Sequence, residues 1–468
     1  MNKRISKITS LFLTVILLCS VFSVPSSAAF SVTEEQWNAY WDTKDVASVH
    51  LSPGSNDTEM CFAWFGTDSE AVPVVYVKSS SDADYTAFTG YAEADSSIDG
   101  VVYKVTATNL IPGTAYEYYC ESGSYKSEIG SFGTSSGKDF NAVLVSDIHV
   151  CYDDEDPDNI RNTAGLYNNI LLEATSRQDD ISLILSAGDT ADKGRYDEYI
   201  GLFANSVTKE VPFATVCGNH DYKDSVFPVV MNRPNVYNDQ AVSPDKNGGD
   251  YWFVKGDVLF LMLNSNWISS SDHKNFVKSA VEANPDVKWR VAVMHHDLYG
   301  GHIPSRESEN ELLRMMFAPI FDEYKVDLVF MGHSHVYSRS HVLYDNEIVT
   351  NLKGKNSVTD AQGTIYITTG STSRPRDVEG NLASDKIACD YTSTTDYIYD
   401  VVNFSEDSIT VTVYAAENEE PIDSFTINKT TSNGGHIDEP INPFYDIVHF
   451  ISLIASIFRS LGQMLGID

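Results

Sequence analysis

The chain has 468 residues, 42% of them hydrophobic, and a formal net charge of −34. This length exceeds one ordinary domain, and the composition excludes a disordered chain. The negative charge excludes nucleic acids and anionic membranes as partners held by long-range attraction, so a site that handles phosphate needs a local source of positive charge.

The N-terminus has the pattern of a secretory leader. Three basic residues within the first seven precede an apolar run over 11–21, and the small residues 27–29 offer a cleavage site. An uncleaved membrane anchor is disfavoured, because the apolar run falls short of the ~20 residues that a span needs. We expect residues 1–29 to be a signal peptide and the chain to be exported, either secreted or associated with the cell surface.

The cysteines give little sign of a disulfide framework. Those that follow the leader are Cys61, Cys120, Cys151, Cys217 and Cys389. An odd number cannot pair fully. Cys61 is one residue out of phase with Phe62 and Trp64, whereas Cys120 is in phase with the tyrosines of its own segment. Because side chains alternate along a strand, these two sulfurs are expected to face opposite sides. We predict no Cys61–Cys120 bond and no structural disulfides, a state compatible with an exported bacterial protein.

Residues 30–136 are predicted to form an all-β sandwich with a short leading helix at 34–42. Short β-runs separated by turns occupy this region, which is typical of a sandwich of domain size. The stretch LIPGTAY, which ends at Tyr116, has the spacing of a tyrosine corner. In that device the tyrosine hydroxyl bonds to nearby backbone of a Greek-key sandwich.

From Phe140 onward, buried strands alternate with amphipathic helices. This pattern predicts an α/β domain over 137–430, with stacked mixed sheets flanked by helices. The strand candidates are 142–145, 182–185, 213–216, 290–294, 327–331 and 364–368. The helix candidates are 159–176, 195–208, 272–283 and 308–324. Two hairpins are expected, which turn at 255–257 and at 405–407.

The C-terminal tail is separate from these domains. Residues 431–443 have the composition of a linker, and residues 444–468 repeat apolar side chains at the spacing of an amphipathic helix. The sequence leaves open whether this helix docks on the parent protein or binds a membrane surface or a partner protein, although it lacks the basic face of a typical lipid binder. A spanning role is disfavoured because Asp446, His449 and Arg459 interrupt the run.

Five predicted strands of the α/β domain end in side chains that can bind a metal. The motifs are SDIH (146–149), GDTAD (188–192), GNHD (218–221), MHHD (294–297) and GHSH (332–335). Ligands collect at the carboxyl ends of strands in α/β sheets. A single motif of this kind is usually a surface turn or a helix cap, but five in order, each after an apolar run, indicate a site.

The residue types fit two metal ions. A pair of ions about 3.5–4 Å apart needs a bridging ligand, and Asp189, with its two carboxylate oxygens, is the candidate. The remaining predicted ligands are Asp147, His149 and His335 for one ion, and Asn219, His295 and His333 for the other. Mixed imidazole and oxygen ligands suit iron, zinc or manganese rather than calcium. Asn219 supplies oxygen without charge, which leaves the site positive for an incoming phosphate.

This series of motifs resembles that of the calcineurin-like metallophosphoesterases, and the match covers residues 138–430. The sandwich, with SVHLSPG near its start and LIPGTAYEYYCESG near its end, looks like the fibronectin type III-like module that precedes the catalytic domain of purple acid phosphatases. MHHDLY and GHSHVYSRS are also similar to that branch. The resemblance implies a metal-dependent phosphoric ester hydrolase of the acid phosphatase type.

Two positions depart from the purple branch. That branch carries tyrosine where this chain has Asp192, and glycine where this chain has His149. The iron-bound tyrosinate that colours those enzymes is therefore expected to be absent, with His149 occupying the position it vacates. We predict a colourless or weakly coloured protein, and the resemblance does not fix an iron–zinc pairing.

The resemblance also implies that His220 contacts the phosphate. An imidazole beside the metals can stabilise the charge of the transition state or protonate the leaving oxygen. His302, which lies seven residues past His295, is a candidate for an additional acid. The expected roles of His296 and Asp297 are open.

Several charged residues near the motifs are given supporting roles. Asp192 and Asp221 are expected to orient histidine ligands. Arg374 and Arg376, in STSRPRD, can touch a substrate phosphate or be solvated, and we expect them to be solvated.

The expected function is an exported phosphatase that hydrolyses small phosphate monoesters by direct attack of a metal-bound hydroxide. No alternative nucleophile is visible, because the chain lacks both a Gly-x-Ser-x-Gly elbow and a phosphate-binding Gly-rich Lys-Ser/Thr loop. The alternatives are a phosphodiesterase, nucleotidase or pyrophosphatase with the same site, or a non-enzymatic surface-binding protein. The intact ligand set argues against the last.

Overall fold

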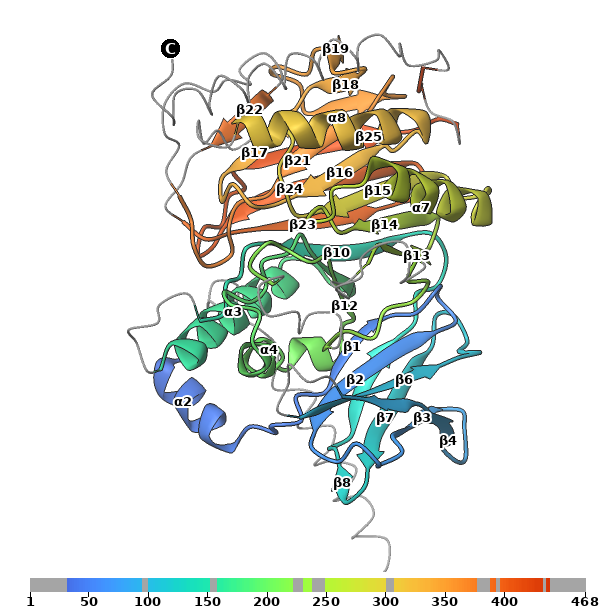
Figure 1. The fold of residues 1–468 in the computed structure, drawn as a ribbon, viewed down its shortest axis with the longest axis vertical. Coiled ribbons are helices and arrows are strands. Elements are labelled where there is room, and N and C mark those ends of the chain that lie inside the picture. Colours follow the sequence, from blue (N-terminus) through green and yellow to red (C-terminus); the bar gives the residue numbers. More distant parts are fainter. Residues whose placement is uncertain are drawn as a thin grey trace, which may run out of the picture.

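The computed structural model consists of an N-terminal sandwich and a larger domain with two stacked sheets (Figure 1). This confirms the predicted fold class. The structure describes residues 32–94, 100–151, 158–221, 230–237, 249–299, 307–376, 388–392, 396–431 and 435–437. The expected signal peptide and C-terminal helix lie outside these residues, as does most of the linker. Within them, no helix combines the length and hydrophobicity that a membrane span requires.

Two antiparallel sheets form the sandwich. The first has the order β1 (His50–Pro53), β2 (Met60–Gly66), β6 (Val101–Ala107), β5 (Tyr91–Glu93). The second has the order β4 (Thr86–Thr89), β3 (Val74–Ser79), β7 (Ala115–Ser122), β8 (Tyr125–Lys126), and β9 (Gly130–Gly133) also pairs with β7. Alternate side chains of β2, β3 and β7 pack between the sheets, among them Phe62, Trp64 and Tyr118.

Two predictions about the sandwich are confirmed. The Tyr116 hydroxyl accepts a hydrogen bond of 2.7 Å from the Ile111 backbone N–H, which is the expected tyrosine corner. Cys120 lies in the sandwich core, whereas Cys61 points away from it toward the Thr106 hydroxyl, 3.5 Å from its sulfur. Neither thiol forms a disulfide among the described residues, and the same holds for Cys151 and Cys217. The Cys389 side chain lies outside the described residues.

The leading helix α2 (Glu34–Thr43) begins with a capping box between Thr33 and Gln36. It packs on the larger domain, because the Trp37 indole N–H donates to the Arg161 carbonyl at 2.8 Å. Arg161 belongs to α3 (Asn159–Ser176). Helix α2, which precedes the sandwich, thus packs against the larger domain.

The larger domain contains two seven-stranded mixed sheets. The first has the order β12 (Phe213–Thr215), β11 (Ile181–Ser186), β10 (Phe140–Val145), β23 (Ile398–Phe404), β24 (Ser408–Ala415), β25 (Asp423–Asn428), β20 (Ser357–Thr359). The second has the order β13 (Tyr251–Lys255), β14 (Val258–Leu263), β15 (Trp289–Met294), β16 (Leu328–Met331), β21 (Ile365–Thr368), β17 (Tyr337–Ser340), β22 (Ala388–Thr392). A separate hairpin joins β18 (Val342–Tyr344) and β19 (Glu347–Thr350).

Apolar side chains on both faces of the sheets explain the layers. Leu144 and Leu185 of the first sheet pack against the same core as Phe260 and Val293 of the second. The outer face of the first sheet packs against α3 and α4 (Tyr196–Leu202). The outer face of the second packs against α7 (Ser270–Ala283) and α8 (Glu307–Glu323). Strands buried on both faces account for the continuous apolar runs in the sequence.

One predicted helix is wrong in its extent. The helix expected over 195–208 is divided into α4 and a short 3₁₀ turn, η1 (Val207–Lys209). Asn205 causes the break: its side-chain amide donates to the Leu202 carbonyl at 2.8 Å, and its side-chain oxygen accepts from the Thr208 N–H at 2.9 Å. An asparagine that bonds to local backbone in this way competes with the helical hydrogen bonds.

The topology brings the ends of several strands together. Strands β10, β11 and β12 are parallel to one another, as are β14, β15, β16 and β21. The loops after them meet, since the His333 N–H donates to the Asp147 carboxylate at 2.9 Å and the Gly332 N–H to the His295 carbonyl at 2.9 Å. Both sheets therefore deliver side chains to one place.

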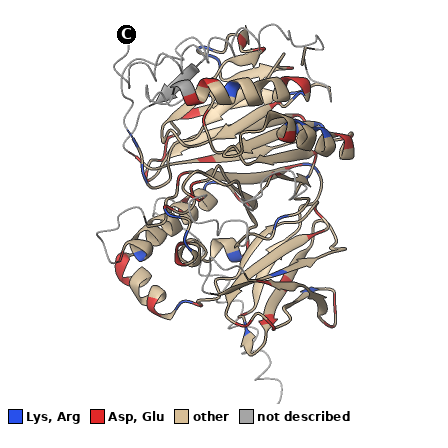
Figure 2. Cartoon of the chain, in the orientation of Figure 1, with Lys and Arg blue, Asp and Glu red and all other residues tan. Residues whose placement is uncertain are grey.

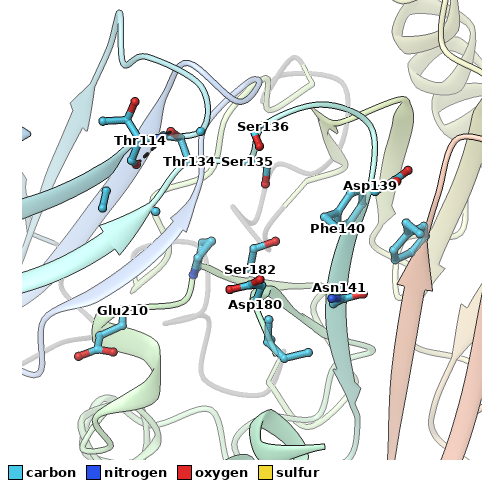
Figure 3. A pocket seen from close by; sticks show the side chains of 16 residues that line it. Thr114, Thr134, Ser135, Ser136, Asp139, Phe140, Asn141, Asp180, Ser182 and Glu210 are labelled. Carbon is cyan, nitrogen blue, oxygen red and sulfur yellow. Dashed lines mark hydrogen bonds between the residues drawn. The ribbon is translucent and has the colours of Figure 1, made fainter. Parts of the chain in front are cut away.

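A cavity of about 550 Å³ lies between the sandwich and the first sheet (Figure 3). Its lining includes Phe140 and Asn141 at the start of β10 and Ser182 near the start of β11. It therefore lies at the ends of the parallel strands opposite to the five motifs.

Candidate metal centre

The five strand-end motifs converge. Asp147 and His149 follow β10, Asp189 follows β11, and Asn219 follows β12 of the first sheet. His295 follows β15, and His333 and His335 follow β16 of the second. The parallel direction of these strands is the reason that residues far apart in sequence meet.

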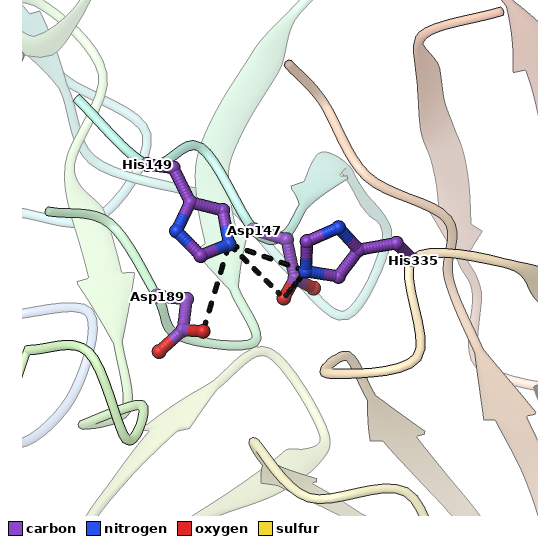
Figure 4. A group of neighbouring side chains, drawn as sticks. All are labelled: Asp147, His149, Asp189 and His335. Atoms are coloured by element: carbon purple, nitrogen blue, oxygen red, sulfur yellow. Dashed lines mark hydrogen bonds and ion pairs between the residues drawn. The ribbon is translucent and has the colours of Figure 1, made fainter. Parts of the chain in front are cut away.

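A first group consists of Asp147, His149, Asp189 and His335, which offer ligand atoms that all lie within 4.8 Å of one another (Figure 4). The Nε2 atoms of His149 and His335 are 3.2 Å apart, and Nε2 of His335 is 3.0 Å from Oδ1 of Asp147. All four residues are buried.

A second group consists of Asp189, His295 and His333. Nδ1 of His333 lies 3.2 Å from Nε2 of His295, and Oδ1 of Asn219 lies 3.1 Å from the same nitrogen. The groups match the sets predicted for the two ions. The structure thus brings the seven predicted ligands together, and their assignment to ions stays a prediction.

Asp189 is common to both groups through one oxygen. Its Oδ2 lies 3.6 Å from Nε2 of His149 and 3.3 Å from Nε2 of His295. Its other oxygen, Oδ1, accepts a hydrogen bond of 2.8 Å from the His220 N–H. The sequence suggested a bridge through both oxygens. Asp189 offers Oδ2 to both groups, whereas its Oδ1 holds the loop of His220, and its role as the bridging ligand stays a prediction.

The backbone at this site is strained. The residues with a positive φ include Asp147 (51°), His149 (45°), Asp189 (50°), His333 (72°) and His335 (60°). Such left-handed conformations are unfavourable for residues with a side chain, and they persist where the surroundings enforce them. Five of the seven predicted ligands therefore have a backbone conformation that the surrounding structure must enforce.

Two positions require glycine because neighbouring side-chain atoms occupy the space that a Cβ would need. A Cβ on Gly218 would lie 2.1 Å from Oδ1 of Asp189, and a Cβ on Gly332 would lie 2.0 Å from the Ser146 hydroxyl oxygen. Neither space admits a methyl group without movement of the site. The glycines of the third and fifth motifs therefore allow the loops to approach the carboxylates.

The ring nitrogens that point away from the site are also held. Nδ1 of His149 is 3.1 Å from Oδ1 of Asp192, Nδ1 of His295 is 2.8 Å from the Ala187 carbonyl, and Nδ1 of His335 is 2.5 Å from the Arg374 carbonyl. Bonds of this kind fix the ring orientation and direct the other nitrogen at the metal position. Asp192 thus orients a histidine, as predicted.

Asp221 has a different role from the predicted one. Its carboxylate accepts from the N–H groups of Thr190, Ala191 and Gly218 and from the hydroxyls of Thr190 and Tyr199, at 2.7 to 3.1 Å. No histidine is among these partners, so the prediction was wrong. Asp221 joins the loop of Asp189 to the loop of Asn219, and thereby fixes the distance between the two motifs.

Attraction between opposite charges sets the direction of the pKa shifts of Asp147, Asp189, His149 and His295. Burial alone would raise the pKa of Asp147 and of Asp189, but His335 and His149 at Asp147, and His295 at Asp189, hold both pKa values below the ordinary range. Burial disfavours the charged form of His149, but Asp147 and Asp192 raise its pKa to about 9. Asp189 similarly raises the pKa of the buried His295 to about 9. Nearby positive charge stabilises these buried carboxylates, and either protons or metal ions can supply it.

His220 is the most exposed histidine of the site. Its side chain is 23% exposed, compared with 0% for His149 and His295 and 6% for His333. Its Nδ1 lies 2.8 Å from the Asp192 carbonyl and 3.2 Å from the Asp192 carboxylate. The ring is therefore both oriented and accessible.

Of the other three residues that the sequence analysis singled out near the motifs, the structure describes two. His302 lies outside the described residues. His296 bonds through Nδ1 to the Ser265 hydroxyl at 2.8 Å and forms, with Glu309 and His333, a further group of possible ligands. The carboxylate of Asp297 bonds to the Ser334 hydroxyl, within the fifth motif.

Two cations lie beside Asp192, of which sequence reasoning missed Lys193 and singled out Arg374 without placing it there. Nζ of Lys193 lies 3.0 Å from Oδ2 of Asp192, and Nη1 of Arg374 lies 3.5 Å from Oδ1 of the same carboxylate. Arg374 was expected to be solvated, and its side chain is 40% exposed. Lys193 follows Asp192 directly in the chain, which was the available signal, but no sequence pattern places Arg374 beside it.

The donor set fits metal ions. Imidazole nitrogens approach one another at 3.2 Å in each group, and carboxylate or amide oxygens lie among them. Atoms with lone pairs that converge in a buried space are stabilised by a cation. The seven predicted ligands comprise four imidazoles, two carboxylates and one amide oxygen, which are ligand types typical of transition metals.

Comparisons with known proteins agree with this geometry. The sequence profile of the calcineurin-like phosphoesterases matches residues 140–337, and that of the purple acid phosphatase N-terminal domain matches residues 46–134. Purple acid phosphatase 23 of Arabidopsis thaliana is 26% identical over 224 residues, which cover 45% of this chain and 44% of the relative. The Fe(3+)-Zn(2+) purple acid phosphatase 12 of the same plant is 27% identical over 194 residues, 38% of this chain and 40% of the relative. The chain spans about half the length of the curated relatives it matches.

A solved structure supports the fold. Purple acid phosphatase PPD1 from yellow lupin (Lupinus luteus) seeds has a TM-score of 0.69 to this chain at 16% sequence identity, and the match covers 82% of this chain and 75% of the lupin chain. At that identity the similarity establishes architecture. The resemblance seen in the motifs is confirmed by these matches, whereas the domain boundaries and the roles of single residues stay predictions.

Proposed function

We propose that this chain is a metal-dependent phosphatase that hydrolyses small phosphate monoesters, because residues 140–337 match the calcineurin-like phosphoesterases and residues 46–134 match the purple acid phosphatase N-terminal domain. One observation carries the proposal. Ligand atoms from four strand ends form two adjoining groups that share Oδ2 of Asp189, and Asn219, from a fifth strand end, lies 3.1 Å from His295 of the second group. This is the arrangement that a two-metal phosphoesterase requires.

The seven predicted ligands would hold two ions of iron, zinc or manganese. When bound, such ions supply Lewis acidity to the phosphoryl group and to the attacking water. A relative is named for an Fe(3+)-Zn(2+) pair, but His149 and Asp192 stand where that branch carries other residues. We therefore do not extend that pairing to this chain.

His220 is proposed to act on the substrate itself. Its backbone N–H is bonded to Asp189 and its ring is bonded to Asp192, so the imidazole is held beside both ligand groups while its edge remains accessible. A histidine in this position can donate a proton to the leaving oxygen or stabilise the charge that develops on the phosphoryl group. Water attacks phosphorus directly, because the motifs provide no nucleophilic side chain.

The runner-up is a phosphodiesterase, nucleotidase or pyrophosphatase with the same ligands. The loops expected to select the substrate include 224–250 and 297–308, which lie largely outside the described residues. A surface-binding protein without activity is the remaining alternative. Export is likewise a proposal, supported by the leader pattern of residues 1–29.

The test is an assay of the purified chain, with metal analysis, against an aryl phosphate monoester, an aryl phosphate diester and nucleotides. Asn219→Ala is expected to lose metal and activity. His220→Ala is expected to keep metal while kcat falls by roughly 10²–10⁴-fold. Asn351→Ala, on an exposed turn, is the control. Full activity of both site variants would contradict the assignment, and preference for the diester would contradict the monoesterase. Folded chain that stays inactive under every metal would favour the binding protein.

A further inference from the structure

Strand β14 reaches the edge of the metal centre without carrying a predicted ligand. It runs parallel to β15, with Leu263 opposite Met294, so the residues that follow these two strands leave the sheet at the same edge. Those after β15 begin with His295, whereas those after β14 are Asn264, Ser265 and Asn266. These three residues belong to none of the five motifs.

Ser265 holds the fourth motif. Its hydroxyl oxygen accepts a hydrogen bond of 3.0 Å from the His296 backbone N–H and lies 2.8 Å from Nδ1 of the same residue. The Ser265 side chain is buried, so water does not compete for these contacts. Because His296 directly follows the predicted ligand His295, the hydroxyl restrains the backbone next to that ligand.

Asn266 holds the third motif, which belongs to the other sheet. Its Nδ2 donates to the Cys217 carbonyl at 2.9 Å. Cys217 lies two residues before the predicted ligand Asn219 and follows β12 of the first sheet, whereas Asn266 follows β14 of the second. A single side-chain amide thus joins the ends of strands from both sheets.

The turn that carries these two residues is itself fixed. The side-chain oxygen of Asn264 accepts from the Asn266 N–H at 3.1 Å and from the Asn266 amide at 3.0 Å. The Asn264 N–H donates to the carboxylate of Asp250 at 2.8 Å, and the other oxygen of that carboxylate lies 2.6 Å from Nδ1 of His273. Asp250, Asn264 and His273 are all buried. The turn is therefore a rigid support.

We propose that Ser265 and Asn266 are positioning residues that set the separation between Asn219 and His295. These two predicted ligands of the second ion come from different sheets, and Oδ1 of Asn219 lies 3.1 Å from Nε2 of His295. The turn over 264–266 bonds to the loop of each. Loss of such an outer partner typically costs about 10–100-fold in metal affinity. The inference deepens the proposed function, and only its kinetic readout rests on that function.

The test measures metal binding at each ligand group separately. Chelator competition gives the zinc affinities, and anomalous diffraction from crystals grown at limiting zinc gives the occupancy of each group. We expect Ser265→Ala and Asn266→Ala each to lower affinity at the second group by about ten-fold or more, and to leave the first group occupied, because each variant removes a support of the second group alone. Asn266→Asp keeps the shape but not the amide donor, so it should behave as Asn266→Ala does.

Matched controls remove similar bonds elsewhere. Ser122→Ala removes the buried hydroxyl that accepts from the Trp64 indole N–H at 3.0 Å within the sandwich. Asn284→Ala removes an amide that donates to the Ala280 carbonyl at 2.8 Å at the end of α7. Both should keep wild-type occupancy at the two groups, which separates positioning from a general loss of stability.

Kinetics supply a second readout. With an aryl phosphate monoester, the activity of Ser265→Ala and Asn266→Ala should fall at limiting zinc and recover at saturating zinc, because every predicted ligand is still present. Unchanged occupancy of the second group, or an equal loss at both groups, overturns the inference. If wild type binds two ions but hydrolyses no monoester, the proposed function fails while occupancy still decides the positioning role. If Ser265→Ala does not fold, Asn266→Asp, at a partly exposed position, decides it.

Discussion

Oδ1 of Asp192 lies 3.1 Å from Nδ1 of His149, and both side chains are almost fully buried. These are the two positions at which the chain departs from the motif of the purple branch. The departures are therefore one structural unit, because the aspartate orients the histidine that we predict as an additional ligand. A change at either position alone would remove this contact between them.

We predict that Asp192→Asn weakens metal binding at the first group. The amide keeps the shape of the side chain but removes the charge that orients His149 and raises its basicity, and loss of such a partner typically costs 10–100-fold in metal affinity. Competition with a chelator measures the affinity. Asp197→Asn, at a carboxylate that is 60% exposed and paired with Arg195, is the control. Equal affinities in both variants would show that Asp192 does not support the ligand.

Iron-loaded protein is predicted to lack an intense tyrosinate absorption band. The colour of the purple branch comes from a tyrosine at the position of Asp192, and that carboxylate is instead engaged with His149 and His220. A visible spectrum recorded with one and two equivalents of iron tests this. The double variant His149→Gly, Asp192→Tyr is the positive control, since it restores both residues of the purple motif. A strong band in wild type would rule the prediction out.

Much of the larger domain could be predicted because its signals are local. The apolar periodicity over 159–176 coincides with α3, and the turn at 255–257 joins β13 to β14. The prediction over 195–208 was wrong because one side chain, Asn205, replaces helical hydrogen bonds with its own. A pattern of hydrophobicity does not show that a side chain will compete with the backbone for helical hydrogen bonds.

The convergence of the candidate ligands was also predictable, because parallel strands place their ends along one edge. The supporting residues were not. Asp221 was expected to orient a histidine but joins two loops. Arg374 is 40% exposed, in line with the solvation expected for it, but its contact with Asp192 was not foreseen. Both roles depend on which loops meet in space, and neighbouring residues in the sequence carry no information about that.

Gly218→Ala is predicted to damage the metal centre without preventing folding. The new Cβ would lie 2.1 Å from Oδ1 of Asp189, so the carboxylate common to both groups would have to move. We expect metal content and activity to fall together. Gly133→Ala is the matched control, because nothing lies within 4 Å of its Cβ. Metal analysis and circular dichroism distinguish site damage from unfolding, and a Gly218→Ala protein with full metal content would refute the steric account.

The last prediction concerns Asp400, a carboxylate of β23 buried between the sheets. Its Oδ1 accepts from the Thr369 hydroxyl at 3.2 Å, and its Oδ2 has no hydrogen-bond partner among the described residues. Burial, with a smaller contribution from Asp423, raises the pKa of Asp400 to about 8. The folded state thus retains a proton that the unfolded state, with an ordinary pKa near 4, releases.

This difference in bound protons sets the direction in which the free energy of unfolding changes with pH. Between about pH 4 and pH 8 the folded state binds more protons at Asp400, so this group makes the free energy of unfolding fall as pH rises, by up to about 1.4 kcal/mol per pH unit. Asp400→Asn removes the titration. Denaturant unfolding at several pH values should therefore give a wild-type curve that falls away from the variant curve as pH rises toward 8 and runs parallel to it above. The exposed Asp407→Asn in the adjoining turn is the control. Parallel curves for Asp400→Asn across the whole range would mean that Asp400 is already ionised in the folded protein and that a cation or ordered water satisfies it.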